Sequence, residues 1–180
     1  MNIEKADYVT VVKFGNIEEL KLKLHNDGKK LDEVINITDE WGMSLLEHCL
    51  GSRKFDTAEY LLRNNAKVNV VSKEGYNEFH CIAANINYEG ALKIARILLE
   101  RGTSLLEKDK KYGNSAIFTL CQEIFKVRSD EGMEFLKECL MKAREFDDCN
   151  KMGYSVRRII NERGTETLKT LINQTETMKK

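Results

Sequence analysis

Apolar residues recur along this chain with the spacing of α-helices, in paired segments separated by polar turns. One segment places them at positions 46, 49 and 50, and the same spacing returns at 79, 82 and 83 and at 117, 120 and 121. Such spacing puts the apolar side chains on one face of a helix. A second helical segment follows with a doubled apolar step, Tyr60-Leu61-Leu62 in one case and Ile97-Leu98-Leu99 in the next. The pattern predicts successive helix pairs and an all-α chain.

A glycine-containing turn precedes each of these pairs. The glycines are Gly42, Gly75, Gly113 and Gly153, which lie 33, 38 and 40 residues apart. Glycine adopts positive φ at low cost, and a Ser or Asn at the start of a helix caps its free N–H groups. After one intervening residue, each glycine is followed by such a residue, namely Ser44, Asn77, Ser115 and Ser155. We therefore expect each turn to lead directly into a helix, and we expect Asn65 and Gly102 to end helices in the left-handed conformation.

The unit of turn, helix, helix and turn resembles the ankyrin repeat. Two stretches carry the closing half of that pattern, Leu61-Leu62-Arg63-Asn64-Asn65-Ala66-Lys67-Val68-Asn69 and Leu98-Leu99-Glu100-Arg101-Gly102-Thr103-Ser104-Leu105, and Phe79-His80 takes the Leu-His place. The sequence departs from the family at Leu45, Glu78, Ala116 and Val156, where the family prefers proline, so the helix starts are less rigidly preset. The resemblance implies an all-α ankyrin-repeat solenoid, in which helix-turn-helix units stack and short β-turns project as fingers.

The resemblance also divides the chain into segments of a single domain, 1–173. We expect an N-terminal capping helix pair in 1–37, repeats in 38–71, 72–108 and 109–148, and a C-terminal capping repeat in 149–173, or about four repeats beside the N-terminal cap. Residues 174–180 are expected to fray. The longer glycine spacings indicate insertions at 85–90 and 123–132, each expected to lengthen the link between the two helices of its repeat.

Composition narrows the classes of function. The 180 residues carry 29 basic and 29 acidic side chains, which leaves no net charge to favour nucleic acid. No apolar run reaches the length of about 20 residues that a membrane-spanning helix needs, and no signal peptide is visible. We therefore expect a cytoplasmic protein that binds neither nucleic acid nor membrane. Residues 1–60 carry a net charge of −4 and residues 61–180 one of +4, a small asymmetry that would draw a basic partner toward the first part.

Catalytic and metal-binding motifs are missing from the sequence. It has no phosphate-binding glycine loop, nucleophile elbow, His-Glu-x-x-His or EF-hand pattern, so we expect no enzyme, no cofactor and no metal. The 5 cysteines are expected to be reduced core residues. The sharpest catalytic alternative is a thiol nucleophile at Cys81 beside His80. The resemblance favours another role for His80, a hydrogen bond to the backbone of an adjacent turn.

Partner-binding residues are expected around the turn glycines, because the fingers and inner helices of such a stack face a partner. Aromatic and Met side chains are enriched at interface hot spots, and several occupy these turns. The alternative is that Trp41 and Tyr76 pack on a neighbouring finger. The predicted partner-binding residues are Glu40, Trp41, Met43, Lys73, Glu74, Tyr76, Lys111, Tyr112, Asn114, Lys151, Met152 and Tyr154.

These observations predict a protein-protein interaction module that is a monomer when unbound. The chain looks like the small bacterial ankyrin-repeat proteins that act as immunity partners of secreted toxins, which implies that it binds and occludes a toxin domain. A general scaffold or effector that binds another protein remains the alternative, and a thiol-dependent enzyme is the third hypothesis. The sequence does not identify the partner.

Overall fold

Helices account for the regular structure of this protein, which we describe from a computed structural model covering residues 1–177. Apart from two isolated β-bridges, Thr38 with Ser44 and Lys108 with Ser115, no β-structure forms within that range. The expectation of an all-α chain is confirmed. The helices are α1 (Tyr8–Phe14), α2 (Ile17–Asn26), α3 (Leu31–Val34), α4 (Leu45–Gly51), α5 (Phe55–Arg63), α6 (Glu78–Ala83), α7 (Ala91–Glu100), α8 (Ala116–Val127), α9 (Asp130–Ala143), α10 (Val156–Arg163) and α11 (Glu166–Thr177).

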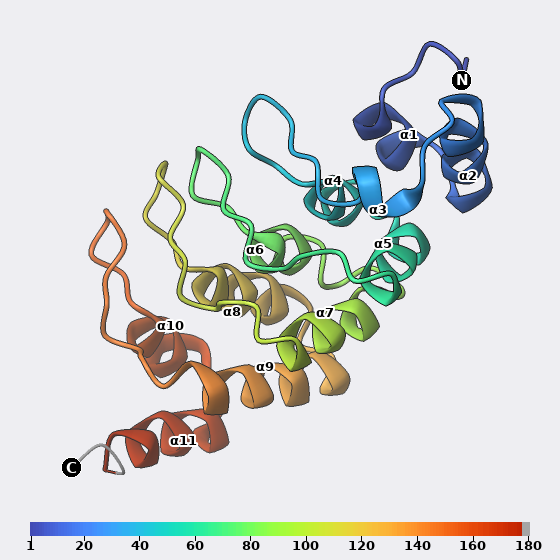
Figure 1. The fold of residues 1–180 in the computed structure, drawn as a ribbon. Helices are drawn as coiled ribbons and strands as arrows, with labels where there is room; N and C mark the ends of the chain where they lie inside the picture. The colour runs from blue at the N-terminus through green and yellow to red at the C-terminus, as the bar shows by residue number, and fades with distance from the viewer. Residues whose placement is uncertain (178–180) are drawn as a thin grey trace.

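The helices form two layers in one elongated stack (Figure 1). The inner layer contains α1, α4, α6, α8 and α10 in that order, and each of these helices packs on the next. The outer layer contains α2, α5, α7, α9 and α11. The loops before α4, α6, α8 and α10 all project from the same edge of the stack (Figure 1). Each of these loops is followed by one inner and one outer helix.

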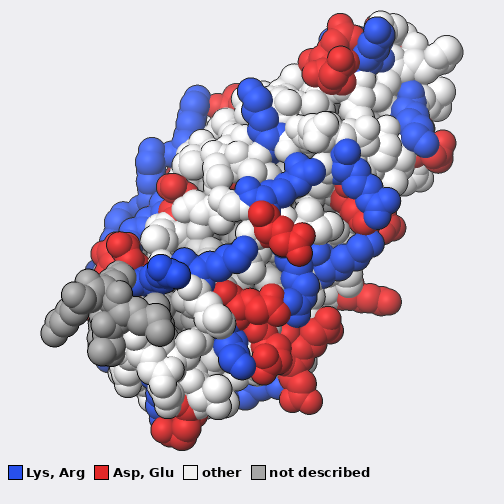
Figure 2. Space-filling model, turned by 60° about the horizontal axis from the view of Figure 1, so that its bottom comes forward, with Lys and Arg blue, Asp and Glu red and all other residues white. Residues whose placement is uncertain are grey.

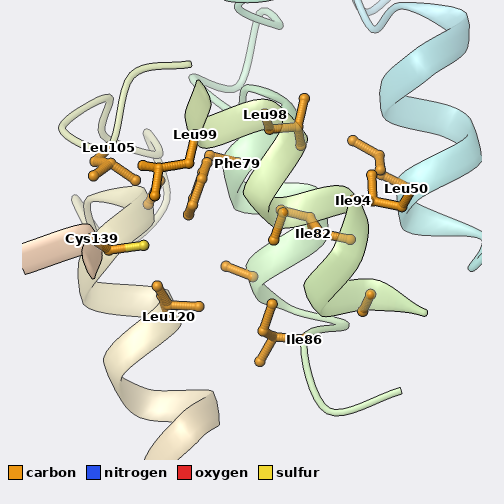
Figure 3. Packing of buried hydrophobic residues seen from close by; sticks show 14 of the residues in the cluster. Leu50, Phe79, Ile82, Ile86, Ile94, Leu98, Leu99, Leu105, Leu120 and Cys139 are labelled. Carbon is orange, nitrogen blue, oxygen red and sulfur yellow. The ribbon is translucent and has the colours of Figure 1, made fainter. Parts of the chain in front are cut away.

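A continuous apolar core runs between the two layers from Tyr8 to Ile172. At its centre, Phe79 of α6 is fully buried and stacks on Phe135 of α9, with ring centroids 6.4 Å apart. Figure 3 shows side chains of successive units meeting there, including Ile82, Leu98 and Leu120. Because each unit buries its apolar face only against its neighbours, the core is as extended as the stack itself.

The predicted capping residues start the four inner helices that follow a turn. The side chains of Ser44, Asn77, Ser115 and Ser155 each accept a backbone N–H from the first turn of α4, α6, α8 and α10 respectively. The predicted helix ends are also correct, since Asn65 and Gly102 have φ values of 63° and 75°. These local features follow from the sequence pattern alone.

The prediction for residues 123–132 was wrong. The extra residues do not lengthen a link: they extend the helices, so that α8 has 12 residues and α9 has 14, with only Arg128 and Ser129 between them. The physical reason is that Ile124 and Phe125 continue the apolar face of α8 and are buried. Residues 85–90, in contrast, do lie in a link, which runs from α6 to Gly90 at the start of α7.

The N-terminal and C-terminal segments add two features. A single helical turn, α3, lies between the first helix pair and the first projecting loop and was not predicted. At the other end, α11 continues to Thr177, past the expected limit at residue 173. Residues 178–180, the remainder of the segment expected to fray, lie outside the described residues.

The outer surface carries charges of both signs. Figure 2 shows Lys and Arg side chains interspersed with Asp and Glu over the face turned to the viewer. Many of them are paired, as in Lys93 with Glu59 and Arg96 with Glu138. In the described part of the chain, no helix combines the length and the apolar character needed to cross a bilayer.

Candidate functional site: the row of fingers

The four projecting loops share one hydrogen-bonding pattern. We name them the first finger (39–43), second finger (72–76), third finger (109–114) and fourth finger (150–154), each closed by a hydrogen bond from the backbone N–H of its first residue to the carbonyl of its last. Each begins with a short polar residue whose side chain accepts backbone N–H groups of the same finger, namely Asp39, Ser72, Asp109 and Asn150. The glycine of every finger has positive φ, as expected. These interactions fix the backbone of each finger without using the other side chains of the tip.

Adjacent fingers are joined backbone to backbone. The N–H of Lys73 donates to the carbonyl of Trp41 at 2.8 Å, that of Lys110 to Glu74 at 2.8 Å, and that of Lys151 to Tyr112 at 2.9 Å. Since the donors and acceptors belong to the main chain, the row forms whatever side chains occupy the tips. The fingers therefore make one ordered surface along the edge of the stack.

The fingers approach one another closely at Gly75. A Cβ atom at this position would lie 2.3 Å from the carbonyl oxygen of Lys108, at the base of the third finger. The glycine also has a φ of +82°, which side chains disfavour. Both the conformation and the close packing of neighbouring fingers thus require glycine there.

The predicted partner-binding residues separate into two groups. Eight are exposed at the tips, and the three largest apolar ones are Trp41, Tyr112 and Met152, with exposed fractions of 56%, 47% and 73%. The other five of the eight are Glu40, Lys73, Glu74, Lys111 and Lys151. The remaining four, Met43, Tyr76, Asn114 and Tyr154, are half-buried.

The half-buried group helps to hold the fingers on the helices. The ring of Tyr76 meets the ring of His80 edge-on at 5.5 Å, and the guanidinium of Arg158 lies 4.0 Å from the centre of the Tyr154 ring. The side-chain oxygen of Asn114 accepts a hydrogen bond of 2.7 Å from the amide of Asn150. Tyr76 therefore packs inward, while Trp41 does not.

His80 ties the inner helix α6 to the third finger. Its Nε2 lies 3.2 Å from the carbonyl oxygen of Asn114, and its Nδ1 lies 2.9 Å from the side-chain oxygen of Asn77. The expectation that this ring bonds the backbone of an adjacent turn is confirmed. Burial lowers the pKa of His80, because the charged imidazolium would lose its solvation there.

Cys81 does not share these contacts. Burial raises its pKa, and the neighbouring carboxyl groups of Glu47 and Glu78 raise it further, so the reactive thiolate is disfavoured. Cys49, Cys121 and Cys139 are buried as expected, whereas Cys149 is exposed, and for it the expectation of a core residue was wrong. The reason is that Cys149 lies in the loop that precedes the fourth finger, outside both helix layers.

Two buried carboxyl groups lie beneath the first and second fingers. Burial raises the pKa of Glu47 to about 7, and the charge of Glu78 adds to the effect. One oxygen of Glu47 accepts the N–H of Ser44 at 2.6 Å, while the other has no hydrogen-bond partner. Glu78 accepts the N–H groups of Asn69 and Val70, and burial raises its pKa as well. These carboxyl groups hold the backbone next to the two fingers through hydrogen bonds.

Among the described residues, no group of His, Cys, Asp and Glu side chains is suited to hold a metal ion.

A cavity of about 480 Å³ opens between the third and fourth fingers and the inner helices α8 and α10. Phe118, Gln122 and Ile159 line it together with residues of both fingers. These three helix residues were not among the predicted partner-binding residues, all of which lie around the turn glycines. Phe118 and Gln122 are four residues apart, which places both on one face of α8. This spacing is the sequence pattern that could have identified them.

We compared the sequence with known proteins. No protein-family model matches it, and a search of curated proteins finds no match.

Proposed function

We propose that this chain is an ankyrin-type repeat protein that binds another protein through its fingers and the adjoining inner helices. The observation that carries the proposal is the contrast within the fingers themselves. Their backbones are fixed by turns and by hydrogen bonds to neighbouring fingers, while Trp41, Tyr112 and Met152 stay exposed at their tips.

The ankyrin assignment is supported by repeated elements as well as by the stacking of helix pairs. Each unit has a finger, an inner helix and an outer helix, and the units recur along the stack. Asn69, in the Val-Asn step of the resemblance, bridges to the next unit by donating to the carbonyl of Gly102 and accepting the N–H of Ser104. The Asn residue of that step thus makes a contact between successive units.

Large exposed apolar side chains favour protein binding. Rigid backbones reduce the ordering that association costs, and aromatic or Met side chains supply much of the binding energy at interface hot spots. Three such side chains on one hydrogen-bonded row meet both conditions. The most specific form of the proposal is an immunity protein whose partner is a protein toxin that it occludes, and the scaffold or effector role differs from it only in the partner.

The experiment compares two triple variants that each remove three exposed apolar side chains. The first is Trp41→Ala, Tyr112→Ala and Met152→Ala at the finger tips. The control is Phe14→Ala, Val127→Ala and Met141→Ala, which removes side chains that are 68%, 60% and 55% exposed elsewhere on the stack. A partner is first isolated from source cells with the unmodified protein and identified, and its affinity for all three proteins is then measured by calorimetry.

We expect the finger variant to bind about 30-fold or more weakly, which corresponds to about 2 kcal/mol, and the control to bind as the unmodified protein does. Loss of binding in the control alone would reject the fingers as the binding surface. The toxin form is tested separately by co-expressing the chain with the product of its neighbouring gene and measuring survival of the host cells.

A further inference from the structure

The cavity between the third and fourth fingers is large enough to hold a side chain. Its volume of about 480 Å³ falls within the range of about 300–1,000 Å³ found for ligand pockets. Phe118 of α8 and Ile159 of α10 form apolar walls, and Tyr112, Met152 and Tyr154 flank them from the fingers. We name this cavity the recess. It is mainly apolar and lies on the ordered finger edge, and unlike the exposed tips it can enclose part of a partner.

One polar group in this recess has no partner of its own. Gln122 lies among the lining residues, half-buried, and within the described part of the chain its amide makes no side-chain hydrogen bond. The side-chain oxygen of Asn114, in contrast, already accepts a hydrogen bond from Asn150. An incoming segment could therefore place an apolar side chain against the walls and a backbone amide against Gln122.

The charged groups at the helix end of the recess neutralise one another or are bound to the backbone. Glu162 pairs with Arg158 at 2.8 Å, and Arg163 donates to the carbonyl of Phe125 at 3.2 Å. The ion pair carries no net charge, whereas Arg163 leaves one positive charge at this end of the recess, because a hydrogen bond to a carbonyl does not neutralise a guanidinium.

The finger end carries more positive charge than the helix end. Lys110, Lys111 and Lys151 lie at the tips of the third and fourth fingers, and in the described residues none has a carboxylate within salt-bridge distance. The ammonium of Lys151 donates to the carbonyl of Lys110, and that of Lys111 lies 4.9 Å from the centre of the Tyr112 ring. The carboxylate of Asp109 is buried and accepts the N–H groups of Tyr112 and Asn114, and among the described residues no ion pair joins it to these lysines.

Lysines on the outer helices are in the opposite situation. Lys93 of α7 pairs with Glu59 at 2.6 Å, and Lys169 of α11 pairs with Glu166 at 2.7 Å. The concentration of unneutralised positive charge beside an apolar recess is thus a local property of the third and fourth fingers. Complementary charge in a partner would orient its approach and exclude basic segments.

From the recess and its charges we infer that the third and fourth fingers bind an acidic, extended segment of the protein partner, which inserts a large apolar side chain between Phe118 and Ile159. Carboxylates that flank this side chain meet Lys110, Lys111 and Lys151. The inference rests on the proposed function, because it specifies which kind of protein segment the fingers bind.

The test uses the full chain and a displayed library of short random peptides as the probe. Binders to the unmodified protein are sequenced, and their affinities are measured again with two variants. Gln122→Arg fills the recess with a longer side chain, and Gln122→Ala is its control. Lys111→Glu with Lys151→Glu reverses the tip charge, and Lys93→Glu with Lys137→Glu on the outer helices is the control for that change. Circular dichroism verifies that every variant is folded.

We expect the enriched peptides to share a Trp, Phe, Leu or Met with Asp or Glu close by. Their affinity should fall about tenfold or more in Gln122→Arg and in the tip-charge variant. It should fall less in Gln122→Ala, which removes one hydrogen bond but leaves the recess open, and should change little in Lys93→Glu with Lys137→Glu. A library that yields no binder, or only binders that are basic or lack the apolar residue, overturns the inference.

The failure of this inference can be distinguished from failure of the proposed function. Peptides whose binding survives Gln122→Arg but is lost in Trp41→Ala would reject the recess while leaving the fingers as the binding surface. Peptides that bind equally to both variants would contradict the recess and the fingers together.

Discussion

The finger edge and the opposite edge of the stack hold neighbouring units together by different means. We name the opposite side the link edge, which consists of segments 15–16, 52–54, 84–90, 128–129 and 164–165, where the two helices of each pair join. There, side chains bridge the units: Lys54 donates to the carbonyl of Phe14 at 3.3 Å, Asn87 to Glu123 at 2.9 Å and Arg128 to Arg163 at 2.6 Å. At the finger edge, hydrogen bonds between main-chain groups join the neighbouring units.

This difference separates residues that the fold requires from residues that are free to vary. On the link edge, replacing a bridging side chain removes a contact between units. On the finger edge, a tip residue can change while the backbone contact remains. Exposure by itself does not make the distinction, since Phe14 and Val127, at the helix ends that adjoin the link edge, are 68% and 60% exposed. The finger edge is the better candidate surface because its backbone order is independent of its side chains.

The largest effect is expected from crowding the backbone of the finger row. Gly75→Ala should lower the free energy of unfolding by about 3 kcal/mol or more, because its Cβ would clash with the Lys108 carbonyl in addition to adopting an unfavourable φ. Gly102→Ala has a similar φ of +75° but meets nothing within 4 Å, so it should cost only about 1 kcal/mol. Denaturant unfolding of both variants measures the difference, and equal costs would contradict the close approach of the fingers.

A smaller effect is expected from removing a bridge at the link edge. Asn85 is buried, and its side chain contacts Arg53 at 3.0 Å, the carbonyl of Leu50 at 3.3 Å and that of Cys81 at 3.1 Å. Asn85→Ala should therefore cost about 2–3 kcal/mol, since it leaves buried partners unsatisfied. Denaturant unfolding again supplies the measurement. A cost below about 0.5 kcal/mol, the usual range for a surface substitution, would mean that the link edge is not held by its side chains.

The stability of the folded chain should depend on pH through Glu47, at the base of the first finger. The pKa of Glu47 is raised to about 7 in the folded chain from its ordinary value of 4.5, so the folded state holds this proton more tightly than the unfolded state does. The free energy of unfolding should consequently fall as the pH rises through this window, and Glu47→Gln should remove that loss. We expect the variant to gain about 1–2 kcal/mol relative to the unmodified protein between about pH 5 and about pH 8.

Urea unfolding at the two pH values checks this prediction. Glu78→Gln provides a contrast at the base of the second finger, because Glu78 uses both carboxyl oxygens to accept N–H groups and an amide nitrogen cannot replace one of them. It should therefore be destabilising at either pH. A stability difference for Glu47→Gln that does not change with pH would refute the raised pKa.

The smallest effect is expected at the finger tips. Trp41→Ala and Tyr112→Ala should each change the free energy of unfolding by less than about 0.5 kcal/mol, because both rings are about half exposed and the finger backbone is held by main-chain bonds. Thermal unfolding of the single variants tests this. A loss of unfolding free energy close to that of Asn85→Ala would show that these rings stabilise the fold. The contrast between the two edges would then be wrong.

Much of the local structure could be predicted from residues close in sequence. The positive φ of the finger glycines, the caps at Ser44 and Asn77 and the ends of helices at Asn65 and Gly102 all follow from short patterns. The failure at 123–132 came from interpreting a long glycine spacing as a longer link, although the apolar positions at Ile124 and Phe125 already continued the helix. Inward packing of Tyr76 could not be predicted, because its partner His80 becomes a neighbour only once the finger folds back over α6.

The sequence by itself determined an all-α chain of helix pairs, each introduced by a glycine turn, because caps, turn conformations and apolar periodicity act over a few residues. Only the tertiary structure decided which fingers touch, why Glu47 and Glu78 are buried, and where α8 and α10 leave a recess beside the lysines. Those features join residues about one repeat apart in sequence, and their geometry depends on how each unit is offset against the next when their apolar faces pack.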